Sequence, residues 1–203
     1  MEKNNYRDLV NRIDTMKEIS DQLELFKPFD DFTSEQITEL LNMMRVKSDE
    51  MGMVLTYLGS EKLKHQIPLL FVHIQDINWP IARFGYVSNI LVDCGTEVFP
   101  ELRRILFTER DEEWHYSIMC LMVSKWSSTL VEQFKAELID YIDLELGSFD
   151  AKLEAFRSLM PILELNEFNS IFKRFSLANT HPISIRELAE LKNEYEAKYL
   201  KRY

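Results

Sequence analysis

Apolar side chains recur at steps of three and four residues along most of the chain, with polar side chains between them. A period near 3.6 residues places such apolar side chains on one face of an α-helix. Two clear stripes predict helices over about residues 6–26 and 129–146. The first stripe contains Leu9, Ile13, Met16, Ile19, Leu23 and Phe26, and the second contains Val131, Phe134, Leu138, Tyr141 and Ile142.

The same periodicity predicts further helices joined by short connections that contain Gly, Pro, Asn or Asp. Their predicted ranges are 33–44, 49–58, 61–73, 79–93, 97–107, 112–126, 150–160, 165–177 and a last helix that ends near residue 199. Ser184 and Glu187 have the spacing of a capping box, which we expect to open this last helix. The chain has only 5 Gly and 6 Pro, too few for the tight turns of an all-β domain. We therefore expect an all-α fold.

A short internal repeat indicates how the helices are arranged. Asp76-Ile77-Asn78-Trp79 recurs 35 residues later as Asp111-Glu112-Glu113-Trp114. A Pro lies inside an amphipathic helix upstream of each copy, and a nearly all-apolar helix follows each Trp. Helix–turn–helix units repeated at a period of this size are typical of HEAT-type solenoids. The repeat predicts stacked antiparallel helical hairpins in a HEAT-like α-solenoid, with Trp79 and Trp114 at equivalent places.

The region around the repeat resembles a bacterial family called domain of unknown function 5071. The family motif joins a Gln-Asp-x-Asn-Trp-Pro-x-Ala segment to an acidic Asp-x-x-Trp-x-Tyr segment. Here these segments run from Gln75 to Ala82 and from Asp111 to Tyr116, and the resemblance covers residues 68–142. It implies an α-helical, HEAT-like domain without an established activity. We expect this core over residues 60–147, flanked by helical extensions over 1–59 and 148–203, the latter packed on the core.

The chain is acidic, with a formal net charge of −10 that is unevenly distributed. Residues 61–147 carry 8 basic and 14 acidic side chains, whereas residues 148–203 carry 9 and 8. An acidic surface repels phosphate backbones and anionic lipid head groups, so we expect neither nucleic acid nor a membrane as partner. The chain shows no apolar block typical of a signal peptide, and its two Cys lack the pattern of a disulfide framework. These features favour a cytoplasmic location.

Histidine and cysteine spacing does not indicate a metal site. His65 and His73 lie eight residues apart, about 12 Å along a helix axis, which is too far to share one metal without other ligands. No zinc, phosphate-loop, dinucleotide or nucleophile-elbow motif is present in the sequence. We therefore expect no catalytic residue, no cofactor and no bound metal.

Polar and aromatic residues of the two repeat copies form the candidate surface for a protein partner. The candidate partner-binding residues are Asp76, Asn78, Trp79, Glu109, Arg110, Asp111, Glu112 and Trp114. A purely structural interpretation also explains them. Asn78 would cap the next helix, Asp76 would stabilise the same positive helix end, and Trp79 would fill the core.

The leading hypothesis is a non-enzymatic protein-binding module that presents an acidic face to a protein partner. Such a face would favour a basic partner. One concrete form is an immunity-type antagonist of a basic bacterial toxin. The alternatives are a small enzyme that uses the Glu109–Glu113 carboxylates with His115, or a structural scaffold. A second candidate binding face is the Met-rich surface of Met43, Met44, Met51 and Met53. The pattern predicts no particular oligomeric state.

Overall fold

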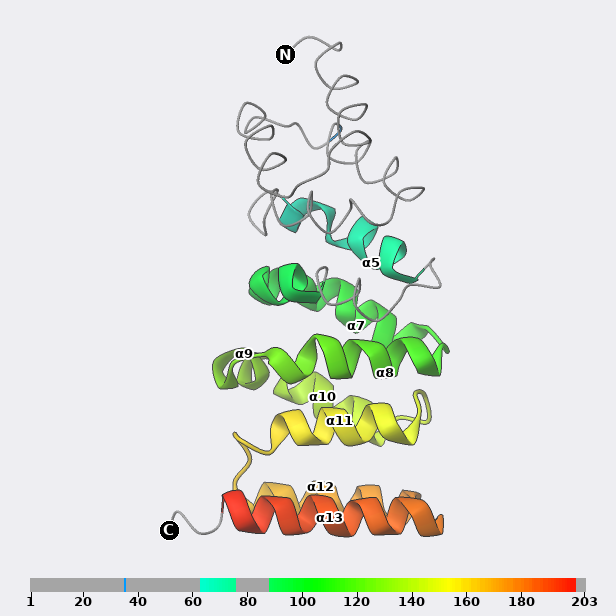
Figure 1. The fold of residues 1–203 in the computed structure, drawn as a ribbon, viewed down its shortest axis with the longest axis vertical. Helices are drawn as coiled ribbons and strands as arrows, with labels where there is room; N and C mark the ends of the chain where they lie inside the picture. Colours follow the sequence, from blue (N-terminus) through cyan, green and yellow to red (C-terminus); the bar gives the residue numbers. More distant parts are fainter. Residues whose placement is uncertain (1–34, 36–62, 76–87, 200–203) are drawn as a thin grey trace, which may run out of the picture. The chain divides into compact units, whose positions relative to one another are not determined.

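The computed structural model describes residue 35, residues 63–75 and residues 88–199 (Figure 1). Contacts divide the chain into two compact units, Met1–Cys94 and Gly95–Tyr203. The described residues form helices and short connections and contain no β-strand, so the all-α prediction is confirmed. Within this part of the chain, no helix has both the length and the apolar character needed to cross a membrane. The predicted domain ranges 1–59, 60–147 and 148–203 stay a prediction.

In the Met1–Cys94 unit the described segments are a 3-10 turn, Lys64–Gln66, helix α5, Ile67–Gln75, and helical residues 88–93. We predicted one helix over 61–73 with Pro68 in its interior. Instead, α5 begins at Ile67, which places Pro68 in its first turn. Pro lacks an N–H and its ring clashes with a preceding helical turn, so it is best accommodated at a helix start.

The Gly95–Tyr203 unit is described from Gly95 to Tyr199 and contains seven α-helices in that range. The α-helices are α7, Phe99–Thr108; α8, Glu112–Leu121; α9, Ser128–Gln133; α10, Lys135–Asp143; α11, Phe149–Leu159; α12, Leu165–Ala178; and α13, Pro182–Lys198. Two 3-10 turns, Gly95–Val98 and Val123–Lys125, precede α7 and α9.

Contacts between these helices define two layers within the unit. In one layer α10 contacts both α7 and α12. In the other layer α8 contacts α11, and Arg157 of α11 lies 4.0 Å from Glu194 of α13. The chain alternates between the layers, so the α7–α8, α10–α11 and α12–α13 connections all emerge at one end of the unit, on the right in Figure 1.

Aromatic rings join successive helices in the core of this unit. The Phe134 ring packs between α7 and the α9 region, with its centroid 4.7 Å from that of Phe99 and 5.6 Å from that of Trp126. Farther along, Phe168 of α12 stacks on Tyr195 of α13 with centroids 3.8 Å apart. The Tyr195 hydroxyl also donates to the Leu163 carbonyl at 2.9 Å. Ring contacts therefore join α7 to the segments around α9, and α12 to α13.

The helix predicted over 129–146 is two helices. Gln133 ends α9 and Lys135 begins α10, and Phe134 between them has φ −111° and ψ 13°, outside the helical range. The break turns the Phe134 ring into the aromatic core, where it is fully buried. The apolar spacing stays at three and four residues across the break, so the pattern could not reveal it.

The start of the last helix also differs from the prediction. It begins at Pro182 rather than at a capping box of Ser184 and Glu187, and Ser184 is buried. His181 is the N-cap residue, and its Nδ1 accepts from the Ile183 N–H at 3.4 Å. Pro at the first helical position has a preset φ, which favours initiation there.

Candidate functional site

The acidic residues singled out in the sequence lie at the connection between α7 and α8. The Glu109 N–H donates to the Ile105 carbonyl at 3.0 Å and ends α7. Asp111 is the N-cap of α8, where its carboxylate accepts from the Trp114 N–H at 3.0 Å. Glu112 occupies the first turn, where a negative side chain stabilises the positive end of the helix. The local fold therefore concentrates negative charge at this connection.

The residues at this connection differ in exposure. Arg110, Asp111, Glu112 and Glu113 are exposed. Glu109 is half-buried and forms an ion pair with Arg104 at 2.8 Å. The Arg104 guanidinium also contacts Glu101 at 2.7 Å, and these two carboxylates, Glu101 first, raise its pKa. Glu109 therefore has a structural partner, whereas Asp111, Glu112 and Glu113 are the acidic side chains presented to solvent.

The α10–α11 connection supplies a second set of acidic side chains that the sequence interpretation missed. Asp143 ends α10, Glu145 follows it, and both are exposed. Arg174 of α12 binds the Asp143 carboxylate, with its Nε 3.0 Å from Oδ2. No Trp accompanies this acidic pair, so the repeat did not mark it. A Gly two residues after Glu145 was the available signal for a connection at this point.

Lys152 of α11 interacts with residues of both acidic connections. Its Nζ donates to the Leu144 carbonyl. Burial lowers the pKa of the Lys152 ammonium, and the carboxylates of Asp143, Glu112 and Glu145 oppose that shift. Glu112 belongs to the α7–α8 connection and the other two carboxylates to the α10–α11 connection. One ammonium therefore interacts with carboxylates of both connections, in agreement with the packing of both α8 and α10 on α11.

His115 lies beneath this end of the unit and is 0% exposed. Its Nδ1 is 3.2 Å from the Tyr141 hydroxyl, a hydrogen bond whose donor depends on the imidazole tautomer. Burial lowers the pKa of His115, against the opposing effect of the Ile105 carbonyl and nearby carboxylates. Burial likewise raises the pKa of Tyr141. Both groups therefore stay neutral near pH 7.

Gly147 closes the space above these two rings. Its φ is +82°, in the left-handed region that side-chain-bearing residues rarely adopt. A Cβ at this position would lie 2.2 Å from the Tyr141 hydroxyl and 3.1 Å from His115 Nδ1. The α10–α11 backbone can pass over the pair only because residue 147 has no side chain.

Several predicted site residues are not brought together at this surface. Trp114 is buried, so it contributes to the core rather than to an exposed contact. Asp76, Asn78, Trp79 and the four Met residues of the alternative binding face lie outside the described residues. The predicted equivalence of Trp79 and Trp114 stays a prediction for the same reason.

The geometry does not favour the enzyme alternative. His115 is buried against Tyr141, while Glu112 and Glu113 are exposed, so they do not share an accessible acid–base surface. Burial raises the pKa of the Cys120 thiol, against the opposing effect of the Tyr116 side chain. A thiol with a raised pKa is a weak nucleophile at neutral pH. Among the residues described, no group of three His, Cys, Asp or Glu side chains could hold a metal ion.

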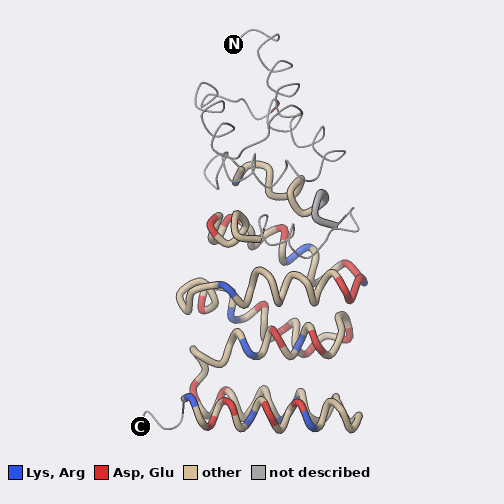
Figure 2. The backbone as a smooth tube through the Cα atoms, viewed as in Figure 1, with Lys and Arg blue, Asp and Glu red and all other residues tan. Residues whose placement is uncertain are grey.

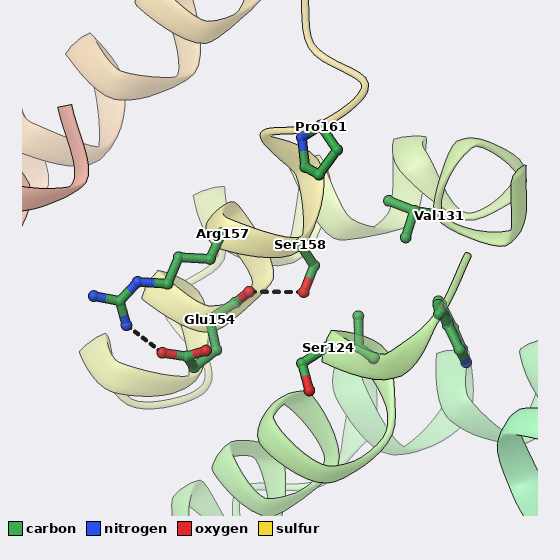
Figure 3. A pocket seen from close by; sticks show the side chains of 8 residues that line it. Ser124, Val131, Glu154, Arg157, Ser158 and Pro161 are labelled. Atoms are coloured by element: carbon green, nitrogen blue, oxygen red, sulfur yellow. Dashed lines mark hydrogen bonds and ion pairs between the residues drawn. The ribbon is translucent and has the colours of Figure 1, made fainter. Parts of the chain in front are cut away.

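A separate pocket of about 170 Å³ lies between α11 and the segment that joins α8 to α9 (Figure 3). Arg157 and Glu154 form an ion pair along one side, and Val131 and Pro161 form the apolar side. The Ser158 hydroxyl donates to the Glu154 carbonyl at 3.0 Å. Because its two charged groups neutralise each other, the pocket has no strong preference for a charged ligand.

Comparison with known proteins gives one result. The family model described as "Domain of unknown function (DUF5071)" matches residues 42–148, slightly more than half of the chain. The match includes both segments of the motif and the α7–α8 and α10–α11 connections. No curated protein matches the chain, and no solved structure does.

Proposed function

Since the chain belongs to the family of domain of unknown function 5071, as its motif predicted, and that description names no activity, we propose a function from the geometry. The protein is a non-enzymatic binding module that presents an acidic surface to a basic protein partner. We define the acidic end as the exposed carboxylates of the α7–α8 and α10–α11 connections. Its members are Asp111, Glu112, Glu113, Asp143 and Glu145.

One observation carries this proposal. Two connections more than thirty residues apart in the sequence place their acidic side chains at the same end of the Gly95–Tyr203 unit, where Figure 2 has two red segments one above the other on the right. Lys152 is half-buried and donates to the Leu144 carbonyl, and Arg174 pairs with Asp143, so these two cations leave the other carboxylates of the acidic end without an ion pair to them. The negative potential of the end is therefore only partly neutralised. Such a surface accelerates the approach of a basic partner, and salt weakens the effect.

We further propose that this unit is a HEAT-like α-solenoid. The two layers of helices support it, because each layer contains every second long helix in chain order, α7, α10 and α12 in one and α8, α11 and α13 in the other. Solenoids of this type bind partners over extended surfaces that several connections build together. An immunity-type antagonist of a basic toxin is one form that such a module would take.

The test is capture of partners from a native lysate with the full chain as bait. A charge-reversal variant, Glu112→Lys with Glu145→Lys, is compared with a control variant that has the same net charge, Glu190→Lys with Glu196→Lys on α13. Glu109 is left unchanged because its ion pair with Arg104 holds the end of α7. We expect the first variant to lose a basic partner that wild type and control both retain.

The kinetic readout follows once that partner is identified. Association of the wild type should slow as salt increases, and charge reversal at the acidic end should slow it at low salt, since charges near an interface act mainly on the association rate. Equal loss of the partner in both variants would point to net charge rather than to this surface. Retention of the partner by both variants would contradict the proposal.

A further inference from the structure

The turn between α12 and α13 carries the most exposed large apolar side chains among the described residues. Leu177, near the end of α12, is 72% exposed, and Ile183 and Ile185, at the start of α13, are 57% and 55% exposed. Single exposed apolar residues are common on protein surfaces. Here three of them flank one short connection, which we call the apolar tip.

The apolar tip adjoins the acidic end. Arg174 of α12 binds Asp143 at 3.0 Å, and Phe149 at the start of α11 stacks on Phe175 of α12 with centroids 5.4 Å apart. Leu177 lies three residues beyond Arg174, so the two side chains are neighbours on the helix surface. In Figure 1 the α12–α13 connection emerges at the same end of the unit as the two acidic connections.

From this juxtaposition we infer that the acidic end and the apolar tip form one docking surface for a basic segment that carries apolar side chains beside its Lys and Arg residues. This inference rests on the proposed function and specifies its partner. The carboxylates attract and orient the segment, and the apolar tip supplies the contact that loses water on binding. Buried apolar contacts hold a complex together, whereas exposed charges mainly speed its formation.

The charge of the surface argues against a second copy of this chain as the occupant. A symmetric dimer brings the same patch of both copies together. Here that arrangement would bring two acidic ends together in a protein of net charge −10. A basic segment instead gains from both parts when its Lys and Arg face the carboxylates and its apolar side chains face the tip, which is itself flanked by the exposed Lys173, Arg174 and Arg186.

The acidic end and the apolar tip lie in different ranges of the chain relative to the family match. The acidic connections fall within the range matched by the family, which ends at residue 148, whereas α12 and α13 begin after it. The matched range alone would present the charges without the apolar tip. The C-terminal hairpin therefore adds a means of selecting among basic partners.

The test uses the full chain and two synthetic peptides of about 18 residues, a length that gives a complete helical face. One carries Leu on one helical face and Lys on the other, and the second has Ser in place of every Leu. Binding is followed by fluorescence anisotropy. We expect the wild type to bind the Leu-containing peptide about tenfold more tightly, which corresponds to partial burial of the apolar tip.

Variants separate the two parts of the surface. Leu177→Ser with Ile183→Ser should remove most of the tenfold difference, since only Ile185 of the apolar tip remains, and should leave binding of the Ser-containing peptide unchanged. Leu165→Ser, an exposed Leu at the opposite end of α12, is the matched control and should keep the difference. Glu112→Lys with Glu145→Lys should weaken both peptides. Circular dichroism checks the fold of each variant, and Leu177→Ser alone, which should reduce the difference partially, replaces any double variant that misfolds.

The outcomes distinguish this inference from the proposed function. If the tenfold difference survives in the Leu177→Ser, Ile183→Ser variant, the apolar tip is not part of the surface, and the proposed function stands provided that charge reversal weakens both peptides. If charge reversal weakens neither peptide, the proposed function itself is contradicted. Self-association in sedimentation that the Leu177→Ser, Ile183→Ser variant abolishes would identify a second copy as the occupant and overturn the inference.

Discussion

Gly147 is a residue whose replacement should disturb the candidate surface, because it covers Tyr141 and His115. Its φ of +82° excludes ordinary side chains, and an added Cβ would overlap the Tyr141 hydroxyl at 2.2 Å. We expect Gly147→Ala to lower the free energy of unfolding by at least about 2 kcal/mol, because backbone strain and overpacking act together. Urea unfolding of the full chain followed by circular dichroism measures this loss.

Gly95 provides the matched control for that substitution. It also has a positive φ, +61°, but nothing lies within 4 Å of the position of its added Cβ. Gly95→Ala should therefore lower the free energy of unfolding only through the strain of a side-chain-bearing residue at positive φ, about 1–2 kcal/mol. Equal losses for the two substitutions would mean that the close approach of residue 147 to Tyr141 has no energetic consequence.

His115 should make stability depend on pH. Burial lowers its pKa in the folded state below the value of about 6.5 in the unfolded chain, so the unfolded chain binds the proton more tightly. The stabilisation by neutral His115 is complete above about pH 6.5 and is lost as the pH falls towards the folded-state pKa. Wild-type protein should be less stable at about pH 5.5 than at about pH 7.5, as measured by urea unfolding.

Replacement of the imidazole tests the assignment of this pH dependence to His115. His115→Gln should lower stability at neutral pH, because it disturbs the contact with Tyr141, and should flatten the change between the two pH values. His65→Gln removes an exposed imidazole that caps no helix in the described residues and controls for the loss of one His. If the His115 variant keeps the full wild-type change in stability, other groups cause the dependence.

Helix α8 depends on its N-cap, and the cap residue belongs to the acidic end. Asp111 accepts the Trp114 N–H at 3.0 Å, so its side chain both starts the helix and contributes surface charge. Asp111→Ala should destabilise the protein by about 1 kcal/mol through loss of the cap, whereas Asp111→Asn should cost much less, because Asn caps about equally well. Thermal and urea unfolding of both variants provide the comparison.

The same pair of variants separates capping from electrostatics. Asp111→Asn removes one negative charge while keeping the cap, so it should slow association with a basic partner without a matching loss of stability. A large loss of stability in Asp111→Asn would show that the charge, rather than the hydrogen bond, stabilises the start of α8.

The Gly95–Tyr203 unit should fold without the rest of the chain. Its described helices bury their own aromatic core, in which Phe156 lies 5.3 Å from Phe168 and 6.2 Å from Phe175 between ring centroids. A fragment of residues 95–203 should show a helical circular dichroism spectrum and a single cooperative thermal transition. The same measurements on the full chain provide the reference.

A shorter fragment, residues 95–164, tests the contribution of the C-terminal hairpin. It lacks α12 and α13 and would expose Phe156, so it should melt at a clearly lower temperature than the longer fragment. An unfolded 95–203 fragment would contradict the independence of the unit. Equal melting temperatures for the two fragments would mean that the hairpin adds little to the core.

Periodicity, composition and the motif were sufficient for the coarse features of this protein. The apolar spacing predicted helices and no strands, because one buried face per helix must repeat with the helical period. The pair of motif segments identified the family, because Trp and Pro at fixed spacing are rare enough to be specific. Charge counting located the acidic Glu109–Glu113 segment, since charge is a property of the residues themselves.

Only the packing of the helices decided which of these residues are buried, which are neighbours and where a helix is interrupted. Whether Phe134 interrupts a helix, whether His115 is buried, and whether Glu145 lies near Glu112 depend on contacts between residues distant in the sequence. Apolar spacing marks the face that a helix buries, but it does not identify the neighbour that covers that face or show whether the helix continues unbroken. The acidic end therefore exists as one surface only in the folded unit, because the packing of α8 and α10 on α11 brings its two connections together.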